Sequence, residues 1–332
     1  MGQTLTQYQY LDRDMILKGV AEWIVKESPF LTGARGLPFK PVQGNALKYN
    51  VEVSLPTVSW LAVGDQITEN VGAYEQRSTS NFTMIGDADT DKSQIALNAT
   101  QNPEAIDIAM KAKAMAHEFE KTFILGQTST TGNTKQFKGL LRMLAELEST
   151  TTTDLDGVNN SQVIAVNAAS GALTMAYMDQ LIDQIMPGKP DLLLMSKKAR
   201  RKLTALQRAA GSGVQMTQPG EFGMIMPTYD GIPIYVSDWM PDNILDGASS
   251  VLTIANYVQA TARASGVDNS IVIALKISDN DVTGLNAGEM SHEVIDPVEN
   301  YNVRRNRFVW YCGAACFRKY SLAALININP DS

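Results

Sequence analysis

Apolar and polar residues alternate strictly in the segment that follows residue 44. The apolar positions are Leu47, Tyr49, Val51, Val53 and Leu55. A period of two predicts a half-buried β-strand, and Pro56 indicates that this strand is an edge strand or is kinked there. The stretch 62–73 predicts a polar tip, and a returning strand runs through Tyr74 to Ile85. A two-stranded hairpin of this length is marginal alone in water, and the chain offers no obvious local surface for it.

A helical period replaces the alternation in residues 102–126. The apolar stripe has spacings of four, three, four and four and consists of Ile108, Ala112, Met115, Phe119 and Phe123. Asn102 is a suitable N-cap, Pro103 suits the first helical position, and Gly126 can end the helix. We therefore expect one long helix of about 36 Å.

Helices and strands alternate in the region 160–290, after a threonine-rich border near residues 149–153. The predicted helices are 174–186 and 196–211, and the predicted strands are 191–195, 232–237, 251–255 and 271–277. Strand-like apolar runs at 309–317 and 321–328 end the chain. Near the N-terminus, an amphipathic helix over 12–26 precedes an extended arm that is rich in Gly and Pro. The whole pattern predicts an α+β protein.

Composition narrows the classes of function. Charged residues make up 19% of the 332 residues, which is low for a soluble protein and leaves more surface for partners to cover. The net charge of -7 argues against DNA binding by bulk attraction as the main task. No apolar window is long enough for a transmembrane helix, and no secretory signal is present, so we expect no membrane partner.

The two cysteines, Cys312 and Cys316, do not form a disulfide framework. On one strand, four positions apart, their Cα atoms would be about 13 Å from each other, which is too far for a bridge. We therefore expect reduced, partly buried thiols.

Few residues carry recognisable chemistry. His117 lies within the long predicted helix with no activated nucleophile beside it, and His292 is the only other histidine. No phosphate-binding loop and no dinucleotide fingerprint is present. We expect no catalytic residue and no cofactor, and therefore no enzyme.

Two acidic segments have part of the spacing of a calcium loop. Asp87, Asp89 and Asp91 occupy the first, third and fifth positions, but Lys92 and Asn98 stand where Gly and Glu are required. The segment 279–284 has the same defect at its twelfth position. Both segments are interpreted as polar turns, and no metal is expected.

Four local patterns resemble the major capsid proteins of tailed double-stranded DNA bacteriophages. The first is the passage from the long helix through Gly126 and a polar loop to Lys-Gly-Leu-Leu at 138–141. The second is Pro-Asp-Leu-Leu-Leu-Met-Ser at 190–196 before a basic helix. The third is Asp-Gly-Ile-Pro-Ile-Tyr-Val-Ser-Asp at 230–238, and the fourth is Val-Trp-Tyr-Cys-Gly at 309–313 with Ser-Leu-Ala-Ala-Leu at 321–325. Their order and spacing carry the resemblance over nearly the whole chain.

This resemblance implies a tailed-phage capsid fold, which encapsulins share. The implied parts are an N-terminal arm at 1–43, a β excursion called the E-loop at 44–96, a peripheral domain with the spine helix at 97–150, an axial α/β domain at 151–290, and closing strands of the peripheral domain at 291–332. The implied function is a major capsid protein that assembles with itself into hexamers and pentamers of an icosahedral shell around phage DNA. Such a shell is assembled in the host bacterial cytoplasm and becomes the virion capsid.

Charged residues at two places are candidates for contacts between subunits. We expect acidic residues of the excursion to meet basic residues near the closing strands, although a plain surface patch explains the basic cluster equally well. The residues are Asp65, Glu69, Glu75, Arg304, Arg305 and Arg307. The basic residues of the helix 196–211 favour a solvated face or a neighbour contact over non-specific contact with packaged DNA.

Further partners follow from the resemblance. The arm begins close to Met1, so a separate scaffolding protein is expected, together with a portal and either a maturation protease or a decoration protein. Some relatives join subunits through a lysine in the excursion, but no lysine lies between Lys48 and Lys92 here. The alternatives are an encapsulin-like compartment, which would hold protein cargo, and an α/β enzyme in region 160–290.

Overall fold

The computed structural model describes most of the chain from Gly36 onward. The described residues are 36–44, 46–97, 102–127, 135–150, 152–166, 171–211, 215–217, 226–240, 242, 269–296, 298 and 301–331. The predicted helix 12–26, most of the predicted arm and the predicted strand 251–255 lie outside them. The described residues form two compact units, a smaller one with 86–113 and 292–308 and a larger one with the rest.

A seven-stranded sheet is the centre of the larger unit. Its order is β5-β14-β10-β6-β9-β8-β7. The strands are β5 (Val163–Ala165), β6 (Leu192–Met195), β7 (Gln215–Thr217), β8 (Met226–Tyr229), β9 (Ile232–Val236), β10 (Ser270–Leu275) and β14 (Leu322–Ile328). β10 is antiparallel to both β6 and β14, whereas β6 and β9 are parallel. The strands predicted near 191, 232 and 271 are therefore confirmed.

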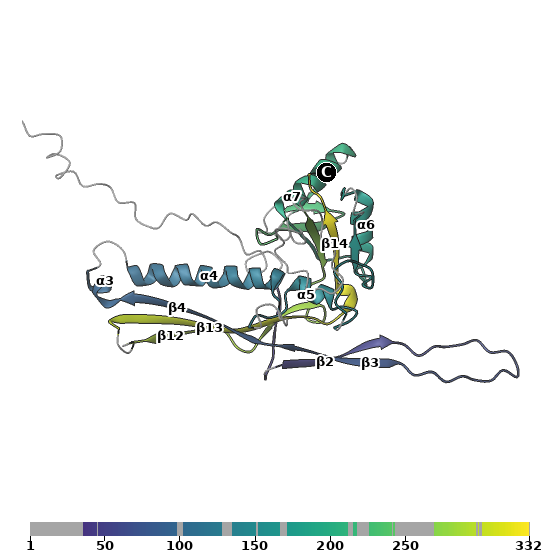
Figure 1. Cartoon of the computed structure of the whole chain (residues 1–332), viewed down its shortest axis with the longest axis horizontal. Coiled ribbons are helices and arrows are strands. Elements are labelled where there is room, and N and C mark those ends of the chain that lie inside the picture. The colour runs from purple at the N-terminus through teal and green to yellow at the C-terminus, as the bar shows by residue number, and fades with distance from the viewer. Residues whose placement is uncertain are drawn as a thin grey trace, which may run out of the picture. The chain divides into compact units, whose positions relative to one another are not determined.

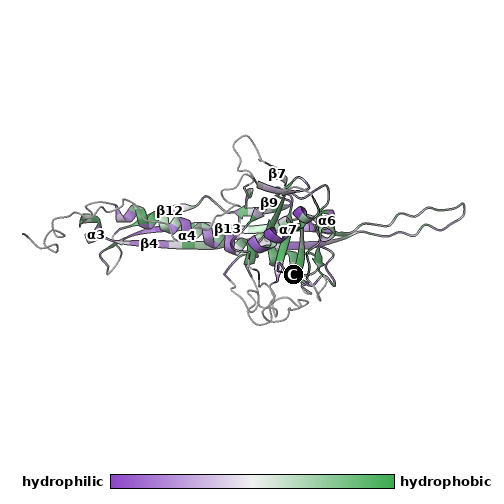
Figure 2. Ribbon diagram, turned by 90° about the horizontal axis from the view of Figure 1, so that it is seen from above, coloured by the Kyte–Doolittle hydropathy of each residue, from purple (hydrophilic) through white to green (hydrophobic). Residues whose placement is uncertain are grey.

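Both faces of this sheet are buried because successive residues of its central strands are apolar. In β6, Leu193 and Met195 belong to the core on one face, and Leu192 and Leu194 belong to the core on the other. Helices α6 (Met175–Asp183) and α7 (Lys197–Ala209) cover the first face. Figure 2 shows largely green strands in this region and purple, hydrophilic positions on α7.

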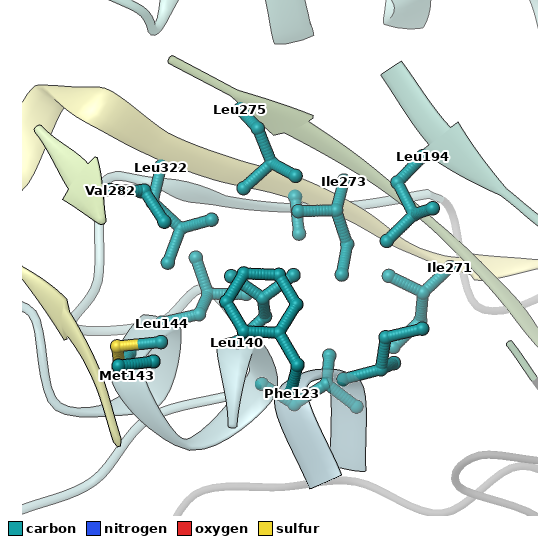
Figure 3. Packing of buried hydrophobic residues seen from close by; sticks show 14 of the residues in the cluster. Phe123, Leu140, Met143, Leu144, Leu194, Ile271, Ile273, Leu275, Val282 and Leu322 are labelled. Carbon is teal, nitrogen blue, oxygen red and sulfur yellow. The ribbon is translucent and has the colours of Figure 1, made fainter. Parts of the chain in front are cut away.

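The opposite face packs against α5 (Leu140–Ala145) and the C-terminal half of α4 (Pro103–Leu125). Figure 3 shows the ring of Phe123 and the side chain of Leu140 below Leu194, Ile273 and Leu275 of the sheet. All five side chains are fully buried. The passage from the spine helix to Gly-Leu-Leu, which resembles capsid proteins, therefore packs against one face of the seven-stranded sheet and forms part of the main core.

Two glycines fix the junction between α4 and α5. The N–H of Gly139 donates to the carbonyl oxygen of Gly126 at 2.8 Å. A Cβ atom on Gly139 would lie 2.4 Å from the nitrogen of Gly126, and one on Gly126 would lie 2.4 Å from the carbonyl oxygen of Phe137. Neither position accepts a side chain, so the close approach of these two segments requires glycine at both.

Helix α4 confirms the predicted long helix. Asn102 Oδ1 accepts a hydrogen bond from the N–H of Glu104 at 3.1 Å and so caps it. Of the predicted stripe, Met115, Phe119 and Phe123 are buried. The 23 residues correspond to about 35 Å.

A second sheet has five strands. Its order is β1-β11-β13-β12, and β4 also pairs with β13. The strands are β1 (Phe39–Pro41), β4 (Phe82–Asp91), β11 (Val282–Asn286), β12 (Ser291–Ile295) and β13 (Val303–Cys316). The strands assigned from sequence to one closing segment at 291–332 are thus divided, because β12 and β13 lie in this sheet and β14 lies in the other.

Strand β4 corrects the interpretation of residues 87–91 as a polar turn. This segment has no apolar alternation, so its sequence alone gives little strand signal. Its partner β13 lies more than 200 residues further along the chain. The short helix α3 (Lys92–Leu97) follows directly.

Strands β2 (Ala46–Ser54) and β3 (Ala73–Ser80) form the predicted hairpin. Leu47, Tyr49 and Val51 are half-buried as the alternation predicts, but Val53 and Leu55 are exposed. The returning strand is interrupted after Ser80, so β3 and β4 are separate. Figure 1 shows the hairpin continuing beyond its paired strands into a long loop.

Among the described residues, no helix is both long enough and apolar enough to span a membrane.

Candidate functional site

Tyr49 attaches the root of the hairpin to the rest of the larger unit. Its hydroxyl donates to the carbonyl oxygen of Cys316 at 3.2 Å, and its ring meets Phe317 edge-on with 5.0 Å between centroids. Burial raises the pKa of Tyr49, so the hydroxyl keeps its proton for this bond. Leu47 packs against the buried cluster of Val42, Leu285 and Ala315. The hairpin therefore has a local surface for its root, and the expectation that the chain offers none is wrong.

Arg77 makes the second attachment. It lies opposite Tyr49 in the register of β2 and β3, and its guanidinium donates to the carbonyl oxygens of Glu146 and Leu147 at 3.2 and 3.0 Å. These carbonyls follow the last turn of α5, where intrahelical partners are missing. Arg142 in turn holds the Glu146 carboxylate at 2.6 Å. Strand β3 is thus fastened to the end of a buried helix.

A pocket of about 320 Å³ lies at this root. Its lining is mainly polar and includes Tyr49, Arg77, Lys138 and Glu146. A binding site for a small organic molecule is mainly apolar with a few polar groups. We therefore interpret the pocket as a polar gap between the hairpin and neighbouring residues of the same unit.

The tip of the hairpin is apolar and exposed. Val58, Trp60 and Val63 are at least 96% exposed, and other large apolar residues of this segment are also exposed. These others are Val53, Leu55, Leu61, Ile67, Val71 and Tyr74. The stretch 62–73 is polar as predicted at many positions, but Val63, Ile67 and Val71 within it are exposed apolar side chains that the prediction did not include. A row of this kind in a folded subunit is typical of a surface that another protein covers.

The three acidic residues proposed for subunit contacts have different surroundings. Asp65 accepts a hydrogen bond from the N–H of Ala62 at 2.8 Å within the turn at the tip. Glu69 is exposed. Glu75 is half-buried and pairs with Arg77 of its own strand at 3.4 Å. Their role between subunits stays a prediction.

The arginines of the predicted basic cluster pair with acids of their own unit. Nε and Nη2 of Arg305 donate to the carboxylate of Asp89 at 2.7 Å, and the same two nitrogens of Arg307 donate to Asp87 at 2.9 Å. These side-chain hydrogen bonds lower the pKa of both carboxyl groups. Such two-bond pairs fix geometry as well as charge, so they hold β4 in register with β13.

Arg304 has a separate partner. It approaches Glu104, in the first turn of α4, at 3.3 Å, and Asn306 donates to the same carboxylate at 3.0 Å. All three clustered arginines thus form ion pairs with acidic residues of the same chain. Their contact with a neighbouring subunit also stays a prediction.

Neither calcium-like segment has the arrangement of a metal site. Asp91 accepts from the backbone and hydroxyl of Ser93, and Asp87 and Asp89 hold arginines. Asp281 is buried and accepts hydrogen bonds from the hydroxyls of Ser278 and Ser321, each at 2.6 Å. Within the described ranges, no group of three or more His, Cys, Asp and Glu side chains is placed to hold a metal ion.

The two histidines lie in structural surroundings. The ring of His117 faces Trp239, with 6.1 Å between centroids. His292 shares a hydrogen bond with Asn306 at 3.1 Å and stacks on Phe308 at 4.7 Å. Neither contact resembles a base that activates a nucleophile.

With this geometry in place, comparison with known proteins identifies the family. The sequence matches the family model described as SU10 major capsid protein over residues 5–263. The chain belongs to the SU10 major capsid protein family. No curated protein matches the sequence.

Solved structures show that this capsid protein has the tailed-phage capsid fold. The SrpI encapsulin of Synechococcus elongatus PCC 7942 is similar with a TM-score of 0.66 at 15% identity, over 100% of this chain and 98% of that chain. A chain of Microbacterium phage Oxtober96 gives 0.63 at 9% identity, over 97% and 98%. The capsid of an empty GTA particle gives 0.63 at 12% identity, over 96% and 95%. At these identities the likeness establishes the fold.

Membership of this family identifies the chain as a major capsid protein, which is a structural role. The region 160–290, for which an enzyme was the alternative, supplies six strands of the seven-stranded sheet and helices α6 and α7 of this capsid protein. Ser196 caps α7 by accepting from the N–H of Ala199 at 3.1 Å, as predicted. The basic residues follow on the outer side of that helix.

Sequence reasoning missed the apolar tip and the attachments at the hairpin root. A signal for the tip was present, because Val58, Trp60 and Val63 stand close together in a segment without charge until Asp65. No local signal marks Arg77, since its acceptors are backbone oxygens about 70 residues away.

Proposed function

We propose that this major capsid protein assembles with copies of itself into hexamers and pentamers of an icosahedral shell that encloses phage DNA, and that the tip of the hairpin is its main contact with a neighbour. The observation that carries the proposal is the exposure of large apolar side chains from Val53 to Tyr74. A free subunit gains nothing from exposing them to water.

The magnitude fits an assembly contact. Burying one side chain of this size contributes about 1.5–3 kcal/mol, so four of them contribute about 6–12 kcal/mol. Association costs about 4–15 kcal/mol in lost freedom. The burial free energy of the tip is therefore comparable with the cost of association. A single contact is weak, and repetition of the contact at every subunit stabilises a closed shell.

Replacing residues 55–72, the loop between β2 and β3 that includes Val58, Trp60 and Val63, with a short Gly/Ser turn tests the proposal. Circular dichroism and the melting temperature should change little, because the tip packs against none of the described core. Shell formation, seen by electron microscopy, should fail or become much weaker. Normal shells from this variant would refute the role of the tip.

A point substitution with a matched control sharpens this test. Trp60→Ser removes the largest exposed side chain of the tip, and Val158→Ser removes an exposed apolar side chain outside the hairpin. The first variant should need a higher subunit concentration for assembly by light scattering. The second should assemble like the unchanged protein.

An encapsulin-like compartment is the second candidate, because the SrpI encapsulin gives a TM-score of 0.66 over the whole chain. The contents of purified particles discriminate the two functions. DNA inside supports the phage capsid, and a protein cargo inside supports the compartment.

Other partners belong to the same proposal. A separate scaffolding protein, a portal, and a maturation protease or decoration protein are expected in a phage that uses this shell, with assembly in the host cytoplasm. Correctly sized shells formed efficiently by this chain alone would contradict the need for a scaffold.

A further inference from the structure

Helix α7 is basic on its exposed side. It contains six Lys and Arg residues in 13 positions and no acidic residue. Its apolar residues Ala199 and Leu203 are buried against the seven-stranded sheet. The charged residues therefore lie on the side that the larger unit leaves open.

Part of this charge is already paired. Lys197 binds Asp238 at 2.6 Å, and Arg201 binds Asp331 at 3.2 Å. Arg200 and Arg208 are exposed, and neither has an ion-pair partner within the part of the chain that the structure describes. Two guanidinium groups, eight positions apart on one helix, are thus available to an external anion.

Helix α6 has the opposite character. It contains Asp179 and Asp183 and no basic residue, and both carboxylates are exposed. Asp179 accepts a hydrogen bond from the hydroxyl of Tyr229 at 2.7 Å, which orients it without neutralising its charge. Gln180, between them, is exposed as well.

The two helices occupy different places on the same sheet. α6 packs mainly on β14, and α7 packs on the adjacent strand β10. Figure 1 shows them apart, with β14 between them in that view. Each subunit therefore carries an acidic patch on α6 and a basic patch on α7, and these can contact two different neighbouring subunits.

We propose that the acidic face of α6 in one copy docks on the basic face of α7 in the next copy. Two unlike, complementary patches on each subunit make a head-to-tail contact, and such contacts generate rings when the rotation closes. This inference rests on the proposed shell function and assigns a contact within its hexamers and pentamers.

Charge complementarity favours a second copy over DNA as the occupant of α7. A phosphate backbone would satisfy Arg200 and Arg208 but would leave the acidic face of α6 without a role. The chain as a whole is acidic, with a net charge of -7, which opposes a polyanion. A copy of the chain satisfies both faces at once.

Charge reversal tests the contact. One variant carries Arg200→Glu and Arg208→Glu, and a second carries Gln180→Lys and Asp183→Lys, which leaves the bond between Asp179 and Tyr229 intact. The third variant combines all four changes. Each is compared with the unchanged protein by thermal melting, native mass spectrometry and light scattering.

Each single-sided variant should keep its melting temperature and need about tenfold more protein to form rings or shells, because attraction becomes repulsion at every contact. The combined variant should return to within about twofold of the unchanged protein. A control carries Asp279→Lys and Asn280→Lys at two adjacent exposed residues. It changes the net charge as much as the α6 variant does and should have no effect on assembly.

The outcomes separate this inference from the proposed function. If the unchanged protein forms no oligomer, both are overturned. If it assembles and the single-sided variants assemble equally well, or the combined variant fails to recover, the contact is overturned and the shell function stands. If the α7 variant assembles normally but its particles lose DNA, the partner of α7 is the genome and the proposed contact is wrong.

Discussion

Arg77 should decide whether the hairpin stays attached at its root. Arg77→Met keeps the length of the side chain and its contacts along the strand but removes every N–H donor. The bonds to the carbonyl oxygens of Glu146 and Leu147, at 3.2 and 3.0 Å, are then lost. The core of the larger unit is untouched, so the change should appear as local opening of β2 and β3.

The magnitude follows from the burial of the group. Arg77 is 16% exposed at its side chain, and a hydrogen bond from a charged donor contributes about 1.5–3 kcal/mol. When the hairpin opens, water can bind the two carbonyl oxygens that Arg77 released. We therefore expect the loss of one such hydrogen-bond contribution in total and not one for each acceptor. Each 1.4 kcal/mol is a factor of ten, so local opening should become about 10- to 150-fold more frequent.

Amide hydrogen exchange measures this opening directly. In Arg77→Met, the amides of residues 46–54 and 73–80 should exchange faster by that factor, while those of β10 and β14 keep their rates. The control is Gln76→Met, since Gln76 is the adjacent residue of β3 and is exposed on the other face. It should leave the exchange of the hairpin unchanged.

Two results would refute the reasoning. Unchanged exchange in the hairpin of Arg77→Met would mean that Tyr49 and the strand pairing alone hold the root. Equal acceleration in β10 and β14 would mean that the hairpin unfolds with the whole unit, and that the root is no separate attachment.

Three further outcomes are expected. Hydrogen bonds from Arg307 lower the pKa of Asp87 in the folded protein. The pair therefore stabilises the fold fully at a pH above the pKa of unfolded Asp, about 4, and this contribution is lost as the pH falls through the lower pKa of the folded state. Urea unfolding between pH 7 and pH 2 should show this loss of stability in the unchanged protein and not in Asp87→Asn. Burial raises the pKa of Cys312 to about 12, so this thiol should resist alkylation at pH 8 until the chain is unfolded. Rapid labelling of Cys312 in the native protein, located by peptide mass spectrometry, would contradict this expectation. Mature particles should give a single band near 36.2 kDa on a denaturing gel, because the hairpin has no lysine between Lys48 and Lys92; a ladder of larger bands would show subunits joined covalently.

The parts of the fold that sequence predicted are those with a strong local period. The stripe of α4 and the cap at Asn102 are contained within about 24 residues, and the buried strand β6 is a continuous apolar run. Each of these signals is complete before any distant residue is considered.

The parts that sequence missed depend on distant partners. Strand β4 is acidic and becomes extended because Asp87 and Asp89 meet arginines 220 and 216 residues away. The arginines of β13 were assigned to a neighbour because their own partners are invisible in the local sequence. The hairpin tip was interpreted from its glycines and polar residues, although Trp60 and Val63 are fully exposed apolar side chains.

The division of the hairpin into an attached root and an exposed tip has a consequence for how such shells diverge. Under the proposed function, a substitution at Val58 or Trp60 should leave folding of the subunit nearly unaffected and should act mainly on the contact with the neighbouring subunit. Tip and receiving surface must then change together, generation by generation, within one lineage. When two related phages infect one cell, their subunits should fold equally well and still sort into separate shells, since each tip fits only the surface with which it has changed.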